Sequence, residues 1–145
     1  MNNKILLISA FILIMLITAN SGRNTLKAGE YYKIRMTFNK TVITAKLYDN
    51  ATTRSFIKKL PLTLPMRNLY EREMVYRFPD PLPAEETATR GYKVGEIIYY
   101  PPLHSFVIMY AQNGERFNMQ SMGYVENNIE VFRGIERTDI LFEQQ

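Results

Sequence analysis

The sequence contains no cysteine, no tryptophan and a single histidine, His104. Without cysteine the chain can form no disulfide, no thiolate metal site and no cysteine nucleophile. One histidine excludes a cluster of imidazole ligands, and a serine–histidine–aspartate triad would have to use His104. Its neighbour Ser105 would point to the opposite side of an extended segment. We therefore expect no metal site, no cofactor and no hydrolytic triad.

Size and composition favour one globular domain. The chain has 145 residues, of which 46% are hydrophobic and 22% are charged, so it is too apolar to be disordered. Its formal net charge is only +4. A charge this small gives no argument for binding nucleic acid, and we expect no nucleic-acid partner.

The first 21 residues have the pattern of a secretory signal peptide. Lys4 precedes an apolar run of about 15 residues, which is short of the roughly 20 that span a bilayer, and small residues follow it. Cleavage after Ser21 would remove residues 1–21 and lower the net charge by one lysine, from +4 to +3. We expect an exported protein, periplasmic or secreted, with no membrane span after cleavage. The alternative is an uncleaved N-terminal membrane anchor, because Arg23 and Lys27 follow the apolar run.

Residues 22–30 are polar and small and predict a flexible lead-in to a domain over residues 31–145. Apolar and polar residues alternate over residues 31–38 and 43–47, on either side of Asn39-Lys40. This pattern predicts a β-hairpin with one buried face. Asp49-Asn50 then offers an N-cap and Pro61 a stop, which predicts a short helix over residues 51–60.

The remainder of the chain reads as short strands. Residues 62–66 and 74–78 alternate, whereas residues 97–100 and 106–110 are nearly continuous apolar runs, typical of strands buried on both sides or lining a barrel. The proline-rich residues 79–90 predict an irregular loop. Further expectations are a hairpin turn at Asn113-Gly114, a strand at 116–120, a helical turn at 127–132 and a strand at 138–142. Seven or eight strands with one or two short helices, and no βαβ alternation, predict a mainly β, barrel-type fold.

Three stretches in this order resemble the bacterial cyclophilin-like family of small β-barrel proteins. They are LYDNATT at residues 47–53, followed by Phe56, LPLTL at residues 60–64 and GEIIYY at residues 95–100. The resemblance covers roughly residues 31–142. It implies a closed barrel of about eight strands, related in fold to the cyclophilins. Because members of this family are largely uncharacterised, the resemblance implies a fold more firmly than an activity.

Cyclophilins themselves are peptidyl-prolyl isomerases, with a pocket that combines an arginine, a phenylalanine-methionine-x-glutamine run, a tryptophan and a histidine. The run RFNMQ at residues 116–120 is similar, but its arginine abuts the phenylalanine and its methionine is displaced by one position. The tryptophan is absent from the whole chain. Alternating faces of an ordinary half-buried strand explain the same run.

The residues that could bind a ligand lie near predicted strand ends, and we take them to be Tyr99, His104, Arg116 and Gln120. We expect them to gather at a groove or mouth of the barrel that binds a peptide or a small molecule. The preferred function is therefore non-enzymatic binding. The alternative is a peptidyl-prolyl isomerase acting on exported proteins, in which Arg116 or Arg77 would face the prolyl nitrogen.

Overall fold

The computed structural model describes Lys27 and residues 29–145, so the predicted signal peptide and most of the predicted lead-in lie outside the described residues. The described part contains nine strands, one α-helix and two 3-10 turns. In chain order these are β1 (Tyr32–Phe38), β2 (Thr41–Leu47), α1 (Ala51–Ile57), β3 (Leu62–Leu69), β4 (Glu73–Arg77), β5 (Thr87–Arg90), β6 (Glu96–Tyr100), η1 (Pro101–Leu103), β7 (Ser105–Met109), β8 (Phe117–Val125), η2 (Ile129–Phe132) and β9 (Arg137–Gln144). None of these helices has the length and apolar composition needed to cross a bilayer.

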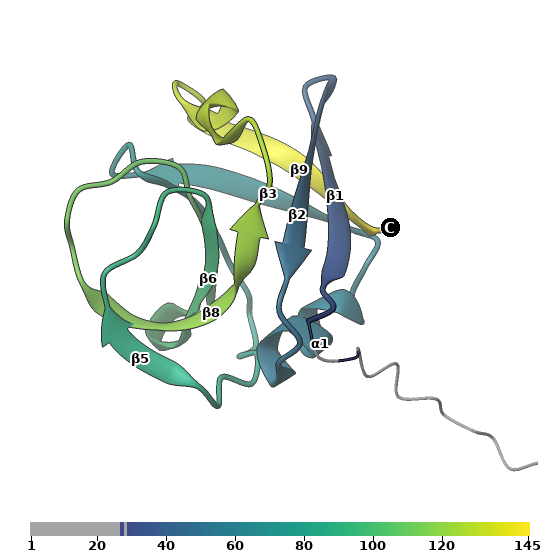
Figure 1. Cartoon of the computed structure of the whole chain (residues 1–145). Coiled ribbons are helices and arrows are strands. Elements are labelled where there is room, and N and C mark those ends of the chain that lie inside the picture. The colour runs from purple at the N-terminus through teal and green to yellow at the C-terminus, as the bar shows by residue number, and fades with distance from the viewer. Residues whose placement is uncertain (1–26, 28) are drawn as a thin grey trace, which may run out of the picture.

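Eight of the strands form a closed antiparallel barrel, which confirms the predicted fold class. The strand order is β2-β1-β9-β3-β4-β7-β6-β8, and a pairing between β2 and β8 closes the ring. The ninth strand, β5, pairs with β8 outside this ring and lies at the side of the barrel in Figure 1. Helix α1 and the single turn η2 lie at opposite ends of the barrel (Figure 1).

The first hairpin forms as its alternating pattern predicts. β1 pairs with β2 from Tyr32↔Leu47 to Phe38↔Thr41. The two turn residues, Asn39 and Lys40, have φ angles of 45° and 62°, as the tight turn between two twisted strands requires.

Helix α1 begins where predicted but ends three residues earlier. The side chain of Asn50 accepts a hydrogen bond from the backbone N–H of Thr53 at 2.9 Å, which caps the first turn. The helix ends at Ile57 rather than residue 60, because the residue before Pro61 is disfavoured in the helical region and the chain unwinds before it. Phe56 lies in the barrel interior, where its ring stacks on Phe106 at 4.7 Å between centroids.

The central strands are buried on both faces, as their continuous apolar sequences predict. On β7, Phe106 and Ile108 belong to the main core inside the barrel. Val107 and Met109 alternate with them and belong to a second apolar cluster, which therefore lies on the outer face of the barrel. This second cluster is the basis of one of the pockets described below.

Two predictions about the second half of the chain are wrong. The loop predicted over residues 79–90 contains β5, a mostly exposed polar strand that carries no apolar alternation by which the sequence could reveal it. The strands on either side of Asn113-Gly114 do not form a hairpin, because β6 lies between β7 and β8 in the sheet. Gly114, with a φ of 80°, belongs instead to a longer connection.

Candidate functional site

Tyr99 and Gln120, two of the four predicted binding residues, are brought together in the structure but are buried. They are opposite each other in the β6–β8 pairing and are 0% and 2% exposed. The hydroxyl of Tyr99 accepts a hydrogen bond from the backbone N–H of Leu82 at 2.9 Å. The side-chain oxygen of Gln120 accepts one from the backbone N–H of Glu86 at 2.7 Å. Both side chains therefore hold the segment of residues 78–90 against the barrel.

The other two predicted residues contact the same segment. The backbone carbonyl of His104, which follows η1, accepts a hydrogen bond from Phe78 N–H at 2.9 Å. The guanidinium of Arg116 reaches the carbonyl of Thr89 at 3.5 Å. All four residues thus support the 78–90 segment, and none of them lines either of the two pockets described next. Their role in ligand binding stays a prediction.

A pocket of about 330 Å³ lies on the outer face of the barrel, and we call it the outer-face pocket. Its floor is apolar because Val75 of β4 and Val107 of β7 are opposite each other in the sheet and both face outward. Tyr100 and Phe117 pack beside them, edge to face at 5.8 Å between ring centroids. The full lining is Leu69, Tyr70, Arg72, Glu73, Val75, Arg77, Tyr100, Leu103, Ser105, Val107, Glu115 and Phe117.

The lining of the outer-face pocket includes an ion-pair cluster in which Arg72 and Glu73 are buried and Glu115 is exposed. The Arg72 guanidinium lies 2.7 Å from a carboxylate oxygen of Glu73 and 2.5 Å from one of Glu115. The same guanidinium lies over the ring of Phe117 at 5.7 Å. Burial alone would lower the pKa of Arg72, but the hydrogen bonds and charges of the two glutamates raise it overall. Arg72 therefore stays charged inside the cluster.

Burial has the opposite effect on the neighbouring carboxyl group of Glu73. Burial raises the pKa of its carboxyl group above the usual value, although Arg72 acts to lower it. A buried pair of this kind contributes little net stability, yet removing one partner leaves a buried charge uncompensated. We therefore expect the loss of either Arg72 or Glu73 to be more costly than the loss of both.

Arg77 lies at the other end of β4, on the same outward face as Glu73 and Val75. It is exposed and forms no ion pair among the residues that the structure describes. An apolar floor with an unpaired guanidinium at its edge suits a ligand that is largely apolar and carries one negative or strongly accepting group.

Sequence reasoning missed the outer-face pocket, apart from Arg77, which it considered for an isomerase. The available signal was the run REMVYR at residues 72–77, in which alternation places Val75 on the same face as charged Glu73 and Arg77. An apolar residue between two charged ones on an outward face indicates a surface that is covered or that binds something.

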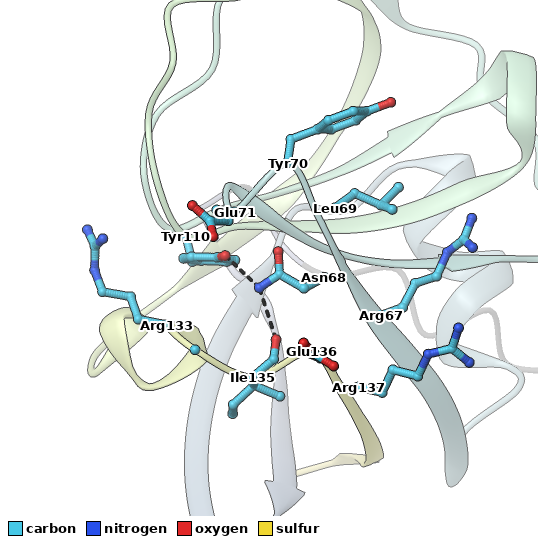
Figure 2. A pocket seen from close by; sticks show the side chains of 11 residues that line it. Arg67, Asn68, Leu69, Tyr70, Glu71, Tyr110, Arg133, Ile135, Glu136 and Arg137 are labelled. Carbon is cyan, nitrogen blue, oxygen red and sulfur yellow. Dashed lines mark hydrogen bonds between the residues drawn. The ribbon is translucent and has the colours of Figure 1, made fainter.

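A second, larger pocket of about 750 Å³ lies between β3, the turn after β3 and the chain that enters β9. We call it the arginine pocket, and Figure 2 shows its side chains. Its lining consists of Arg67, Asn68, Leu69, Tyr70, Glu71, Tyr110, Arg133, Gly134, Ile135, Glu136 and Arg137. Within Lys27 and residues 29–145, no group of three or more histidine, cysteine, aspartate or glutamate side chains is placed to hold a metal ion.

Comparisons with known proteins agree with this architecture. A family model described as the cyclophilin-like family matches residues 36–143. The solution structure of the hypothetical protein AF2241 from Archaeoglobus fulgidus superposes with a TM-score of 0.65, covering 83% of this chain and 100% of that one. The two sequences are 14% identical, so this likeness concerns the fold alone. Among curated proteins no match was found.

Proposed function

The chain belongs to the cyclophilin-like family, and we propose that it is an exported, non-enzymatic domain that binds a peptide or small molecule in its outer-face pocket. The supporting observation is the apolar floor of Val75 and Val107 beside the unpaired Arg77. A volume of about 330 Å³ accommodates one or two apolar side chains of a peptide. The ligand class that fits is an apolar peptide segment with a carboxylate or backbone carbonyl directed at Arg77.

Peptide titration tests this proposal. The probe is the N-succinylated peptide Ala-Ala-Pro-Phe-anilide, which joins apolar side chains to one carboxylate, and calorimetry measures its affinity. We expect Arg77→Gln to weaken binding about tenfold, because a hydrogen bond to a charged group contributes about 1.5 kcal/mol. The matched control is Arg116→Gln, an exposed arginine outside the pocket, which should leave the affinity unchanged.

The outcomes separate the competing functions. Loss of binding in Arg116→Gln but not in Arg77→Gln would place the site at the four residues predicted from the sequence. No binding of the peptide to the unmodified protein would contradict the binding function. Accelerated prolyl isomerisation of the same peptide in a protease-coupled assay, abolished by Arg77→Gln, would establish the isomerase alternative.

Export is supported by the apolar run near the N-terminus and is tested separately. Expression of the full chain in a bacterial host, followed by N-terminal sequencing, should give a protein that begins after Ser21. Recovery of the intact chain from the membrane fraction would favour the anchored alternative instead.

A further inference from the structure

Three arginines line the arginine pocket without a carboxylate partner. Neither Arg67, Arg133 nor Arg137 forms an ion pair with any residue of the described part of the chain. The arginines that do form ion pairs there are Arg35, Arg54, Arg72 and Arg90. Of the five arginines without an ion pair in this part of the chain, three line this pocket, and Arg77 and Arg116 lie elsewhere.

Two of these arginines are held side by side by the sheet itself. Arg67 of β3 and Arg137 of β9 are directly opposite each other in the antiparallel ladder. Figure 2 shows both side chains extending in the same direction at one side of the pocket. Like charges directly opposite each other destabilise a sheet. An oxyanion bound between them would replace this repulsion with charge-assisted hydrogen bonds.

The carboxylates at the pocket do not neutralise it. Glu71 and Glu136 also line the pocket, and neither takes part in an ion pair among the described residues. Three guanidinium groups against two carboxylates leave the lining with a formal charge of +1. The pocket thus has a surplus of donors suited to an anion.

The floor of the pocket is fixed by hydrogen bonds. The side-chain amide of Asn68 donates to the hydroxyl of Tyr110 at 2.6 Å and to the carbonyl of Ile135 at 2.9 Å, as Figure 2 shows. The backbone N–H of Asn68 donates to the carbonyl of Glu136 at 2.8 Å. Because the Tyr110 oxygen accepts from Asn68, its own O–H hydrogen can turn toward a ligand. The floor and the backbone that carries Arg67 are therefore held in place before a ligand arrives, which reduces the entropy lost on binding.

We propose that the arginine pocket binds a small dianionic oxyanion compound, either a phosphate monoester or a dicarboxylate. Arg67 and Arg137 bind one charged group together, whereas Arg133 lies at the opposite edge of the pocket (Figure 2). The volume of about 750 Å³ exceeds that of a bare phosphate, so the ligand has a body that lies against Leu69 and Tyr70. This site differs from the outer-face pocket in its charge and in the arginines that line it.

Nuclear magnetic resonance can test this site with two simple probes. Inorganic phosphate and succinate are titrated separately into the isotopically labelled protein at constant ionic strength, and the arginine Nε–H signals are followed. We expect saturable shifts at Arg67 and Arg137 in the millimolar range. Replacing both residues (Arg67→Gln with Arg137→Gln) should weaken binding by at least about tenfold, since each contributes charge-assisted hydrogen bonds. Lys58→Gln is the control, since Lys58 is an exposed cation that follows α1 and lies outside both pockets, and this variant should bind as the unmodified protein does.

The results decide both the site and the source of the anion. A response to phosphate alone supports a phosphate ester, a response to succinate alone supports a dicarboxylate, and a response to both supports the shared chemistry. No saturable shift with either probe would overturn the proposal. Equal affinity in the double variant and in Lys58→Gln would also overturn it. Circular dichroism checks that the double variant is folded.

Discussion

Replacement of Gly123 by alanine should open the barrel at the place where it closes. Gly123 of β8 is opposite Leu47 of β2 and also pairs with Ile97 of β6, at a bulge in the β6–β8 ladder. Its φ angle is 154°, a conformation that residues with a side chain rarely adopt. A Cβ atom at this position would lie 2.0 Å from the carbonyl oxygen of Lys46 and 2.7 Å from the Cα of Leu47. These are backbone atoms, so no side-chain rotation can make room.

The magnitude follows from what the two strands lose when they separate. Two backbone hydrogen bonds flank the contact, from Tyr48 N–H to the Met122 carbonyl at 2.8 Å and from Glu126 N–H to the Thr44 carbonyl at 2.9 Å. Each contributes about 1 kcal/mol, and the backbone strain of an alanine at this φ adds about 1–3 kcal/mol. We therefore expect Gly123→Ala to lower the free energy of unfolding by about 3–5 kcal/mol, a large part of the total of a small domain.

Urea unfolding measures this loss. Because the chain has no tryptophan, far-ultraviolet circular dichroism and tyrosine fluorescence report the transition. Gly91→Ala is the control, since an added Cβ there would meet no atom within 4 Å, and it should change the free energy of unfolding by less than about 0.5 kcal/mol. A Gly123→Ala variant within about 1 kcal/mol of the unmodified protein would refute the argument from close approach.

Two further predictions concern the outer-face pocket and the 78–90 segment. Burial raises the pKa of Glu73 above 4.5, so its contribution to stability is full below that pH and is lost as the pH rises through the raised value. Urea titrations at several pH values can compare the unmodified protein with Glu73→Gln. The free energy of unfolding of the unmodified protein should fall relative to that of the variant as the pH rises toward neutrality. A difference that stays constant with pH would contradict this. Tyr99→Phe leaves the N–H of Leu82 without its acceptor, which costs about 1–3 kcal/mol and should speed limited proteolysis within residues 79–86. Tyr100→Phe is the control because its hydroxyl makes no hydrogen bond within the described residues, and equal cleavage rates in the two variants would contradict the anchoring role.

The strands that could be predicted are those whose side chains alternate or are continuously apolar. Neighbouring residues of a strand face opposite sides of the sheet. The alternation in β1 and β2 therefore indicates one buried face, and the apolar runs of β6 and β7 indicate two. β5 has a polar sequence and pairs at the edge of the sheet, so nothing in its composition distinguishes it from a loop. The error at Asn113-Gly114 has a different cause. A turn signal is local, whereas the insertion of β6 between β7 and β8 depends on contacts far apart in the chain.

The candidate binding residues were chosen for their chemistry at strand ends, and the structure shows what that chemistry does locally. Polar groups on Tyr99 and Gln120 satisfy the backbone N–H groups of Leu82 and Glu86, which precede β5 and belong to no strand. A sequence cannot distinguish this use from ligand binding, because both need a hydrogen-bonding side chain on a strand. The outer-face pocket depends instead on which residues of β4 and β7 are opposite each other, such as Val75 and Val107, and this register is fixed only by the folded barrel.

The two proposed sites meet at the turn between β3 and β4. Leu69 and Tyr70 line both pockets, and Tyr70 is 76% exposed while its ring lies over the Arg72 guanidinium at 5.1 Å. Tyr70 and Glu71 have φ angles of 58° and 50°, where a non-glycine residue costs about 1–3 kcal/mol. A tyrosine in this strained and exposed position gains little from burial, since most of its surface stays in water. Tyr70 instead contributes to the lining of both pockets and contacts the Arg72 guanidinium with its ring. Because this side chain lines both pockets, we expect a change in its position to alter the shape of both sites.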